Sequence, residues 1–412
     1  MAQLISNQRH LFDIPADVAY LNVATMGPLP MAASEAGQRG LARKLRPWTI
    51  PDTDFFEDTR RLRPLLAALI GADEAGIAFV PSASYGLATA ARNLPLAKGQ
   101  KILLLEHQFP SNVYTWRDHA RQSGAVIETV AARGNESLSD ALLGAITPDT
   151  ALVACPQVRW TDGARIDLVA IGTRCREVGA ALVLDLTQSC GAMTFDVREV
   201  QPDFAVAAGY KWLLGPYATG FLYAAPYRRG GKPLEQNWIT REGASDFSRL
   251  IDYTDAYAPG AERYDMGERS NFALLPALQA SVQLILNWGV ANIEATLAHQ
   301  NRALAEALEA RGLTTGPEAD RGPHYLGALL PDTAPGDLTA RLKAENIYVS
   351  KRGNRLRITP HLFTSENDIA RFLSALDRHL GWRVRTASSA GSPAAGLPPA
   401  PSDPSGHGGC TI

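Results

Sequence analysis

Two charged residues stand in stretches of the chain that are otherwise apolar. Asp185 directly follows the run Ala-Leu-Val-Leu, and Lys211 lies within the apolar segment 204–214. Each segment is short and bounded by glycine, which is typical of a buried strand end in an α/β sheet. Because a buried carboxylate or ammonium group is costly unless it is paired or used, these two residues are the first candidates for chemistry.

The chemistry open to this pair follows from burial of the lysine. Desolvation disfavours the charged ammonium form of Lys211, lowers its pKa, and leaves a neutral amine that can attack a carbonyl carbon. Asp185, on the neighbouring strand end, could hold a protonated ring nitrogen. A lysine joined to an aldehyde and a carboxylate beside a pyridinium are the two fixed features of pyridoxal phosphate sites. On these residues alone, a structural ion pair remains the alternative.

The segments around the pair alternate between strand and helix patterns. Short apolar runs predict strands at residues 77–80, 102–105, 151–154 and 181–184, and helical spacing predicts helices at 54–70 and 168–178. Strands and helices that alternate at short connections favour a doubly wound, mostly parallel sheet. In such folds the loops at the carboxyl ends of the strands carry the sites, which is where polar residues accumulate here.

One of these loops has the composition of an anion site. Small and hydroxylated residues at 81–84 follow the predicted strand 77–80, and a helical pattern begins near Tyr85. A helix that begins directly after such a turn presents free backbone N–H groups to a phosphate. An ordinary strand-to-helix connection with serine as the N-cap is the alternative.

The remaining pattern divides the chain into four parts. We assign residues 1–49 to an N-terminal arm that contributes to a small domain, and residues 50–260 to a large cofactor-binding domain. Residues 261–385 combine long Ala- and Leu-rich helices, short strands and a terminal amphipathic helix, which predicts a smaller α+β domain. Residues 386–412 are mostly Ala, Ser, Gly and Pro, and we expect a disordered tail that exposes Cys410.

Composition excludes several partners. The net charge is -2 and the pI is about 6.5, so there is no basic excess for nucleic acid or an anionic membrane surface. No apolar run approaches the roughly 18 residues of a membrane span. The N-terminus lacks the pattern of a secretory signal, and the four cysteines have no metal-site or disulfide-framework spacing. We therefore expect a cytoplasmic protein without a metal site.

The sequence resembles the class V aminotransferase family of fold-type I pyridoxal phosphate enzymes, which includes cysteine desulfurases, selenocysteine lyases, kynureninases and isopenicillin N epimerases. The resemblance spans about residues 20–379 and is best in LVLDLTQSCGAM and GYKWLLGPYATGFLY. The family's Asp, Gln or His, and Gly correspond here to Asp185, Gln188 and Gly191. It implies that Lys211 forms the Schiff base with pyridoxal 5′-phosphate, Asp185 pairs with the pyridine nitrogen, and Gln188 bonds the phenolic oxygen.

The resemblance extends to the phosphate and to the cofactor ring. It implies that Ala83 and Ser84 bind the phosphate, as does Tyr210, which stands where desulfurases usually carry His and kynureninases carry Tyr. The family's serine two residues before the lysine is Gly209 here, so we expect that phosphate contact to be lost. FPSN resembles the kynureninase FPSD or FPTD motif and implies that Phe109 stacks on the cofactor. Plain loop packing of Phe109 is the alternative.

Two further positions bear on substrate and subunit contacts. Arg357, in LRITPHLF, matches the arginine that binds the substrate α-carboxylate in the family; a surface ion pair is the alternative. Where many relatives have Gly-Thr-Pro, with a threonine that reaches the partner subunit's phosphate, this chain has Gly267 followed by Glu268 and Arg269. That contact could pass to Ser270 or Asn271, or Arg269 could serve an acidic substrate group.

The resemblance implies an amino acid substrate, with Lys211 as the base for the α-proton and a homodimeric assembly. We predict a lyase of kynureninase-like or C–S lyase-like type, because of FPSN and the Tyr210–Lys211 pair. An aminotransferase or epimerase is the alternative, and a non-enzymatic cofactor-binding scaffold is a third. Residues 348–356 contain no cysteine, which disfavours a persulfide-carrying desulfurase. The sequence does not name the substrate.

Overall fold

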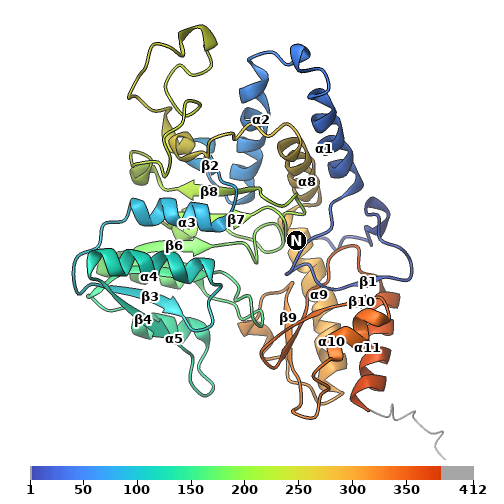
Figure 1. Cartoon of the computed structure of the whole chain (residues 1–412). Coiled ribbons are helices and arrows are strands. Elements are labelled where there is room, and N and C mark those ends of the chain that lie inside the picture. Colours follow the sequence, from blue (N-terminus) through green and yellow to red (C-terminus); the bar gives the residue numbers. More distant parts are fainter. Residues whose placement is uncertain (1, 382–412) are drawn as a thin grey trace, which may run out of the picture.

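A seven-stranded sheet in the order β2-β8-β7-β6-β5-β3-β4 forms the centre of the larger part of the molecule (Figure 1). The computed structural model describes residues 2–381, so the predicted tail and Cys410 lie outside the described residues. The strands are β2 (Ile77–Phe79), β3 (Lys101–Leu105), β4 (Val126–Val130), β5 (Thr150–Pro156), β6 (Ala181–Asp185), β7 (Phe204–Ala208) and β8 (Gly220–Ala224). Only β8 is reversed, pairing antiparallel with both β2 and β7. The expected doubly wound, mostly parallel sheet is confirmed.

Both faces of this sheet are buried, which explains its continuous apolar strands. In β3, Leu103 and Leu105 belong to one core cluster while Ile102 and Leu104 belong to another, as the alternation of side chains in a strand requires. The helices of this part are α2 (Asp54–Leu69), α3 (Ala83–Arg92), α4 (Ser111–Ser123), α5 (Leu138–Ala145), α6 (Leu168–Val178) and α7 (Val197–Val200). Helices α3 and α4 cover the face seen in Figure 1.

A three-stranded antiparallel sheet and its helices form the smaller part, drawn in orange and red in Figure 1. Its order is β11-β12-β9, and it encloses a third core cluster. The elements are α9 (Val290–Glu309), β9 (Leu326–Leu329), α10 (Leu338–Ala344), β10 (Ile347–Tyr348), β11 (Ser350–Arg352), β12 (Arg355–Ile358) and α11 (Glu366–Leu380). Helix α8 (Leu274–Trp288) instead contributes Leu278, Val282 and Ile285 to the core of the large sheet. The domain boundaries given above remain a prediction.

The N-terminal segment joins the two parts. Strand β1 (Ala19–Tyr20) pairs with β10, and helix α1 (Met31–Arg43) packs against α8. Between them the Gly27 amide donates to the Tyr210 carbonyl at 2.9 Å. A Cβ atom at Gly27 would lie 2.1 Å from the Lys211 carbonyl oxygen, so only glycine fits. The segment therefore fastens the smaller part to the loop that carries Lys211.

No single helix among residues 2–381 is long and apolar enough to cross a membrane, although α8 and α9 together, with a 74° bend between them, reach that length and composition.

The close contact at Gly27 predicts that one added methyl group destabilises the protein. Gly27→Ala places a carbon within overlap distance of backbone, and overpacking of this kind costs about 1–3 kcal/mol of unfolding free energy. Urea unfolding of the purified protein measures this change in unfolding free energy. Gly144→Ala is the matched control, because Gly144 lies in α5 with open space around it and alanine favours a helix by up to about 1 kcal/mol. Equal unfolding free energies of the two variants would contradict this close packing of Gly27 on the loop that carries Lys211.

Candidate active site

A cavity of about 220 Å³ opens at the carboxyl ends of the parallel strands. Its walls come from the loops after β2, β3, β5, β6 and β7, which contribute residues 81–84, 108–111, 156–160, 185–188 and 208–211. This is the edge at which doubly wound sheets place their sites. The topology therefore gathers residues between Pro81 and Ala218, which lie 137 positions apart in sequence.

Lys211 lies in this cavity, in the turn after β7. Strand β7 ends at Ala208, so the lysine is three residues beyond the strand and not at the strand end that the apolar run predicts. Its side chain is 6 % exposed, and burial lowers its pKa to about 8, with Asp185 acting in the opposite direction. No hydrogen bond joins its Nζ to another residue within 2–381, and the Phe109 ring centroid is 5.2 Å away. A partly neutral amine thus faces open space.

Asp185 is the last residue of β6 and is also buried. Its Oδ1 accepts from the Thr187 amide at 3.0 Å, and the Thr187 hydroxyl accepts from the Ala208 amide at 3.1 Å, which ties the ends of β6 and β7 together. Asp185 and Lys211 interact electrostatically, but no direct ion pair joins them in the described part of the chain. The simple structural ion pair is therefore not formed between these two residues, and both line the cavity.

Gln188 is held from two sides. Its Nε2 donates to the Ala24 carbonyl and its Oε1 accepts from Trp212 Nε1, both at 3.1 Å. Beneath it, His324 Nε2 lies 2.6 Å from the Gln188 carbonyl oxygen, and burial lowers the pKa of this histidine to about 4. Because an amide NH₂ has two hydrogens, one remains for a ligand in the cavity. The predicted bond from Gln188 to the cofactor stays a prediction.

The anion end of the cavity is the start of α3. The helix begins at Ala83, two residues earlier than its pattern predicts, and Ser82 is the N-cap, with its Oγ accepting from the Tyr85 amide at 3.2 Å. Within residues 2–381 the amides of Ala83 and Ser84 have no acceptor, so two donors are available to a phosphate. In the turn before Lys211, a Cβ at Gly209 would lie 2.3 Å from Thr219 Oγ1, so a serine there would require that hydroxyl to shift.

Two aromatic side chains form a further wall. Phe109 meets Trp160 edge to face with ring centroids 5.4 Å apart, and Trp160 Nε1 donates to the His107 carbonyl at 2.7 Å. Tyr210 also lines the cavity and packs on Tyr217 at 4.6 Å. Our sequence reasoning missed Trp160, although its place in the loop after β5 is a signal that could have revealed it.

A polar residue of the cavity was missed as well. Gln108 lies in the loop after β3, and its Nε2 is buried without a partner among the described residues. An unpartnered buried donor is costly unless a ligand satisfies it. The amide is therefore consistent with a polar group bound in the cavity, and the loop position beside Phe109 was the available signal.

Arg357 lies behind Trp160 and not in the cavity wall itself. Its side chain is 1 % exposed, and its donors reach neutral oxygens: Ser350 Oγ at 2.9 Å, the Trp160 carbonyl at 2.9 Å and Thr25 Oγ1 at 2.8 Å. No carboxylate pairs with it within residues 2–381, so the surface ion pair considered from the sequence is wrong. A buried guanidinium without a counter-ion is a place for an anion.

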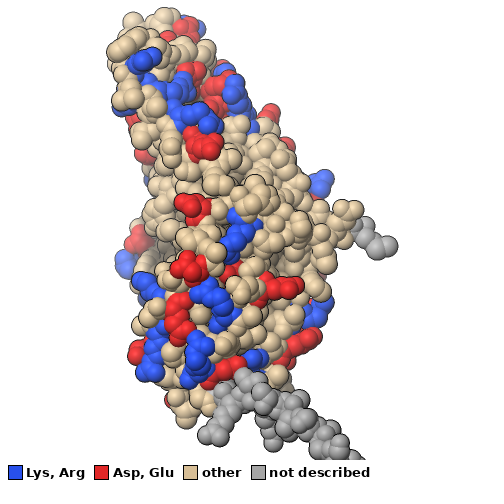
Figure 2. Space-filling view, turned by 90° about the vertical axis from the view of Figure 1, so that its right-hand side faces the viewer, with Lys and Arg blue, Asp and Glu red and all other residues tan. Residues whose placement is uncertain are grey.

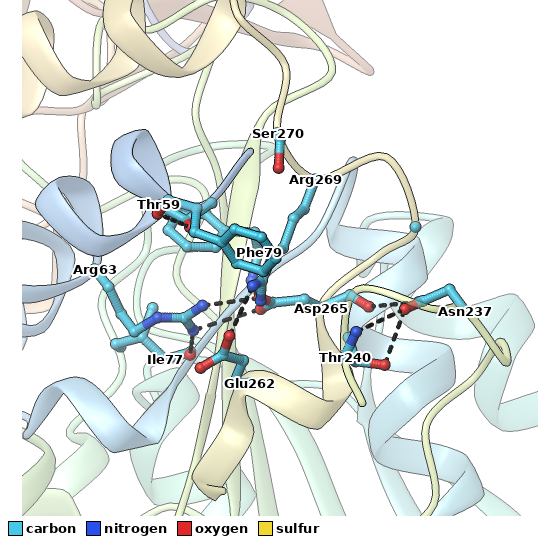
Figure 3. A network of polar contacts seen from close by, with 12 residues as sticks. Thr59, Arg63, Ile77, Phe79, Asn237, Thr240, Glu262, Asp265, Arg269 and Ser270 are labelled. Carbon is cyan, nitrogen blue, oxygen red and sulfur yellow. Dashed lines mark hydrogen bonds and ion pairs between the residues drawn. The ribbon is translucent and has the colours of Figure 1, made fainter. Parts of the chain in front are cut away.

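The segment after Gly267 takes part in a buried network of ion pairs (Figure 3). Arg269 is 1 % exposed and forms ion pairs with Asp265 and, at 2.7 Å, with Glu262, while Arg63 bonds the same Asp265 at 2.8 Å. Its guanidinium is engaged in this network, so the idea that Arg269 serves an acidic substrate group fails.

Ser270 lies outside the cavity and donates to the Phe55 carbonyl. Its predicted contact with a partner subunit's phosphate stays a prediction.

Comparison with solved structures defines the fold class. The chain superposes on a structure of a C-DES mutant with glycine covalently linked to the PLP cofactor, with a TM-score of 0.82 at 21% identity, covering 90% of this chain and 99% of that one. It superposes on a cysteine desulfurase from Thermococcus onnurineus NA1 with a TM-score of 0.78 at 22% identity, covering 92% and 100%. The fold is that of these pyridoxal phosphate-dependent proteins.

Sequence comparison defines the family. Residues 50–371 match the family described as "Aminotransferase class-V", and the chain belongs to that family of pyridoxal phosphate-dependent enzymes. It is 29% identical to a kynureninase of Deinococcus radiodurans over 68% of each chain. It is 25% identical to the isopenicillin N epimerase of Streptomyces clavuligerus, covering 88% of this chain and 95% of the relative. The expected cofactor and enzyme class are confirmed, and the non-enzymatic scaffold is not supported.

The electrostatics around Lys211 predict a pH shift. Asp185→Asn removes the negative charge that raises the pKa of Lys211, so this pKa falls below about 8 and the fraction of neutral amine at pH 7 rises. The pH dependence of labelling by an amine-reactive reagent, read at Lys211 by peptide mass spectrometry in cofactor-free protein, measures it. Thr187→Val, which keeps the carboxylate, is the control. An unchanged or higher midpoint for Asp185→Asn would refute the coupling.

Proposed function

We propose that this enzyme binds pyridoxal 5′-phosphate covalently at Lys211 and acts on the Cα of an amino acid whose carboxylate Arg357 receives. The observation that carries the proposal is the buried, unpartnered amine of Lys211, which faces a cavity with a carboxylate on one wall and a helix N-terminus on another. A lysine in this state is a nucleophile toward an aldehyde at neutral pH.

The residues present fit the cofactor. Backbone amides of Ala83 and Ser84, with Tyr210 nearby, would hold its phosphate. Asp185 would keep the ring nitrogen protonated, and Phe109 would lie against the ring. The bound cofactor supplies an electron sink for negative charge that develops at the substrate Cα.

The chain's own groups supply the proton chemistry. Once its amine is free, Lys211 takes the α-proton as general base, and its pKa of about 8 suits proton transfer near neutral pH. Arg357 would orient the substrate carboxylate through its positive charge and through the one Nη2 hydrogen that no residue within 2–381 accepts. The rings of Phe109 and Trp160 form an apolar wall on this side of the cavity.

Among the reactions open to such a site, we favour a lyase of kynureninase-like or C–S lyase-like type. The FPSN segment and the Tyr210–Lys211 pair support it, as does the similarity to a protein named kynureninase. The alternative is an aminotransferase or epimerase, supported by 27% identity to the "Uncharacterized aminotransferase YcbU" of Bacillus subtilis over 77% of this chain and 82% of that one. Cys155 and Cys190 are buried with raised pKa values, so neither is suited to carry a persulfide.

We expect replacement of Lys211 to abolish the covalent attachment of the cofactor. After reconstitution with pyridoxal 5′-phosphate and borohydride reduction, the wild-type peptide that contains Lys211 gains the mass of the cofactor, and Lys211→Ala gives no labelled peptide. Lys351→Ala, on the half-buried β11, is the control and keeps the label. Label at another lysine, or none in the wild type, would sink the proposal. Products from an amino acid panel then separate the reactions: pyruvate, alanine or sulfide indicates a lyase, and amino transfer to a keto acid indicates a transaminase.

We also propose that the enzyme is a cytoplasmic homodimer. The segment from Met26 to Trp48 exposes a series of large apolar side chains: Met26, Leu29, Met31, Leu41, Leu45 and Trp48. Trp48 is 80 % exposed. Figure 2, which views the side of the molecule that carries α1, shows charged side chains at the top and bottom and fewer of them in the area between. An apolar surface of this kind is typical of a permanent protein interface.

We expect charged residues placed in this surface to dissociate the dimer. The double variant Leu41→Asp with Trp48→Asp desolvates two carboxylates in the interface, and we expect a monomer at micromolar concentration where the wild type is a dimer. Light scattering after size-exclusion chromatography measures the mass. Val169→Asp, an exposed position on α6, is the control and leaves the dimer intact. A monomeric wild type would refute the homodimer.

A further inference from the structure

Four polar residues share one face of the small sheet. In the antiparallel pairing of β11 with β12, Ser350 stands opposite Arg357, and Arg352 stands opposite Arg355. Because side chains alternate along a strand, these four residues lie on the same face, while Leu356 lies on the other face in the third core cluster. Three of the four are arginines. The fold therefore brings several positive charges to one surface.

This face is turned toward the cavity wall. The guanidinium carbon of Arg352 lies 5.3 Å from the Trp160 ring centroid, and that of Arg357 lies 5.8 Å from it. Trp160 lines the cavity that holds Lys211. Arg357 and Arg352 both lower the pKa of Lys211, which places their charges within electrostatic reach of its amine. The two arginines thus lie against Trp160, and their charges reach the amine in the cavity.

The carboxylates near this face do not neutralise all of its arginines. Asp162, the carboxylate that Arg355 reaches at 3.8 Å, is already bonded in bidentate fashion by Arg159 at 2.9 and 2.5 Å. Arg352 donates to the Lys351 carbonyl at 2.7 Å, and within residues 2–381 no carboxylate pairs with it or with Arg357. Burial and the charge of Arg357 lower the pKa of Arg352. The charges of these two guanidinium groups are therefore left without a carboxylate among residues 2–381.

We propose that the substrate carries two carboxylates, with Arg357 binding the α-carboxylate and Arg352 binding a second carboxylate on the side chain. The inference rests on the proposed function, because it takes the amino acid site at Lys211 as given. Arg357 is almost fully buried and Arg352 is half-buried, so the second carboxylate lies nearer the solvent. An acidic amino acid of the aspartate or glutamate type has this chemistry, since each of its carboxylates suits a guanidinium fork.

Binding to the cofactor-loaded enzyme tests the substrate class. Absorbance titrations with L-aspartate and L-glutamate are compared with L-alanine and L-norvaline, and we expect roughly ten- to a hundredfold tighter binding of an acidic amino acid. Arg352→Gln removes this preference and leaves the binding of neutral amino acids within about twofold. Arg352→Lys restores part of it, because the charge returns without the planar fork.

The control variant is Arg355→Gln, which lies on the same face but contacts Asp162, and it keeps the preference. Equal binding of acidic and neutral amino acids by the wild type would overturn the inference. Equal weakening of both classes by Arg352→Gln would also overturn it, because it would assign that residue a merely structural role.

A second measurement separates this inference from the proposed function. Succinate and butyrate differ by one carboxylate and cannot react at Lys211, so calorimetric titration of the enzyme with each reports on the arginines alone. We expect succinate to bind at least tenfold tighter in the wild type and equally with butyrate in Arg352→Gln. If no cofactor attaches to Lys211 while succinate is still preferred, the proposed function fails and the two-anion site stands. If the cofactor attaches and succinate is not preferred, the proposed function stands and the two-anion site fails.

Discussion

Burial of the Lys211 amine without a partner is the constraint on which the site depends. A protonated lysine in such a place is costly, and the protein reduces that cost by shifting the amine toward its neutral form. Asp185 is close enough to favour the charged form and yet too far to pair with it directly. Both groups line the same cavity, where a ligand can reach them.

The N-terminal segment couples the small sheet to this site through three neighbouring residues. Ala24 accepts from Gln188, Thr25 accepts from Arg357, and Gly27 packs on the loop of Lys211. These contacts join residues more than 160 positions apart. The arginine behind Trp160 and the lysine inside the cavity are therefore held in one frame, which is what an enzyme needs in order to orient a small substrate between them.

A second buried network supports the other edge of the large sheet. Asp265 accepts from the Phe79 amide at 2.7 Å and from Arg63, and the Met266 amide donates to the Phe79 carbonyl at 2.9 Å (Figure 3). The outermost strand β2 is thus bonded along its free side by the segment after the short helix η6 (Gly260–Tyr264). Removal of one charge from such a network leaves another buried and unpaired, which is strongly destabilising. Arg269 belongs to this support and not to the active site.

Much of the site was readable from the sequence, because its central residues interrupt local patterns. Asp185 and Lys211 are charges in apolar runs, and the strand and helix periods around them predict the sheet. Trp160 stands out only by its place in the loop after β5. Arg352 and the partners of Arg357 interrupt no local pattern, since each gains its role only where a distant segment folds against it. Thr25 and Arg357 are 332 positions apart, and Trp160 and Arg357 are 197 apart. Local sequence determined which groups could do chemistry, and only tertiary structure decided which charges remain unpaired, because pairing depends on contacts across the whole chain.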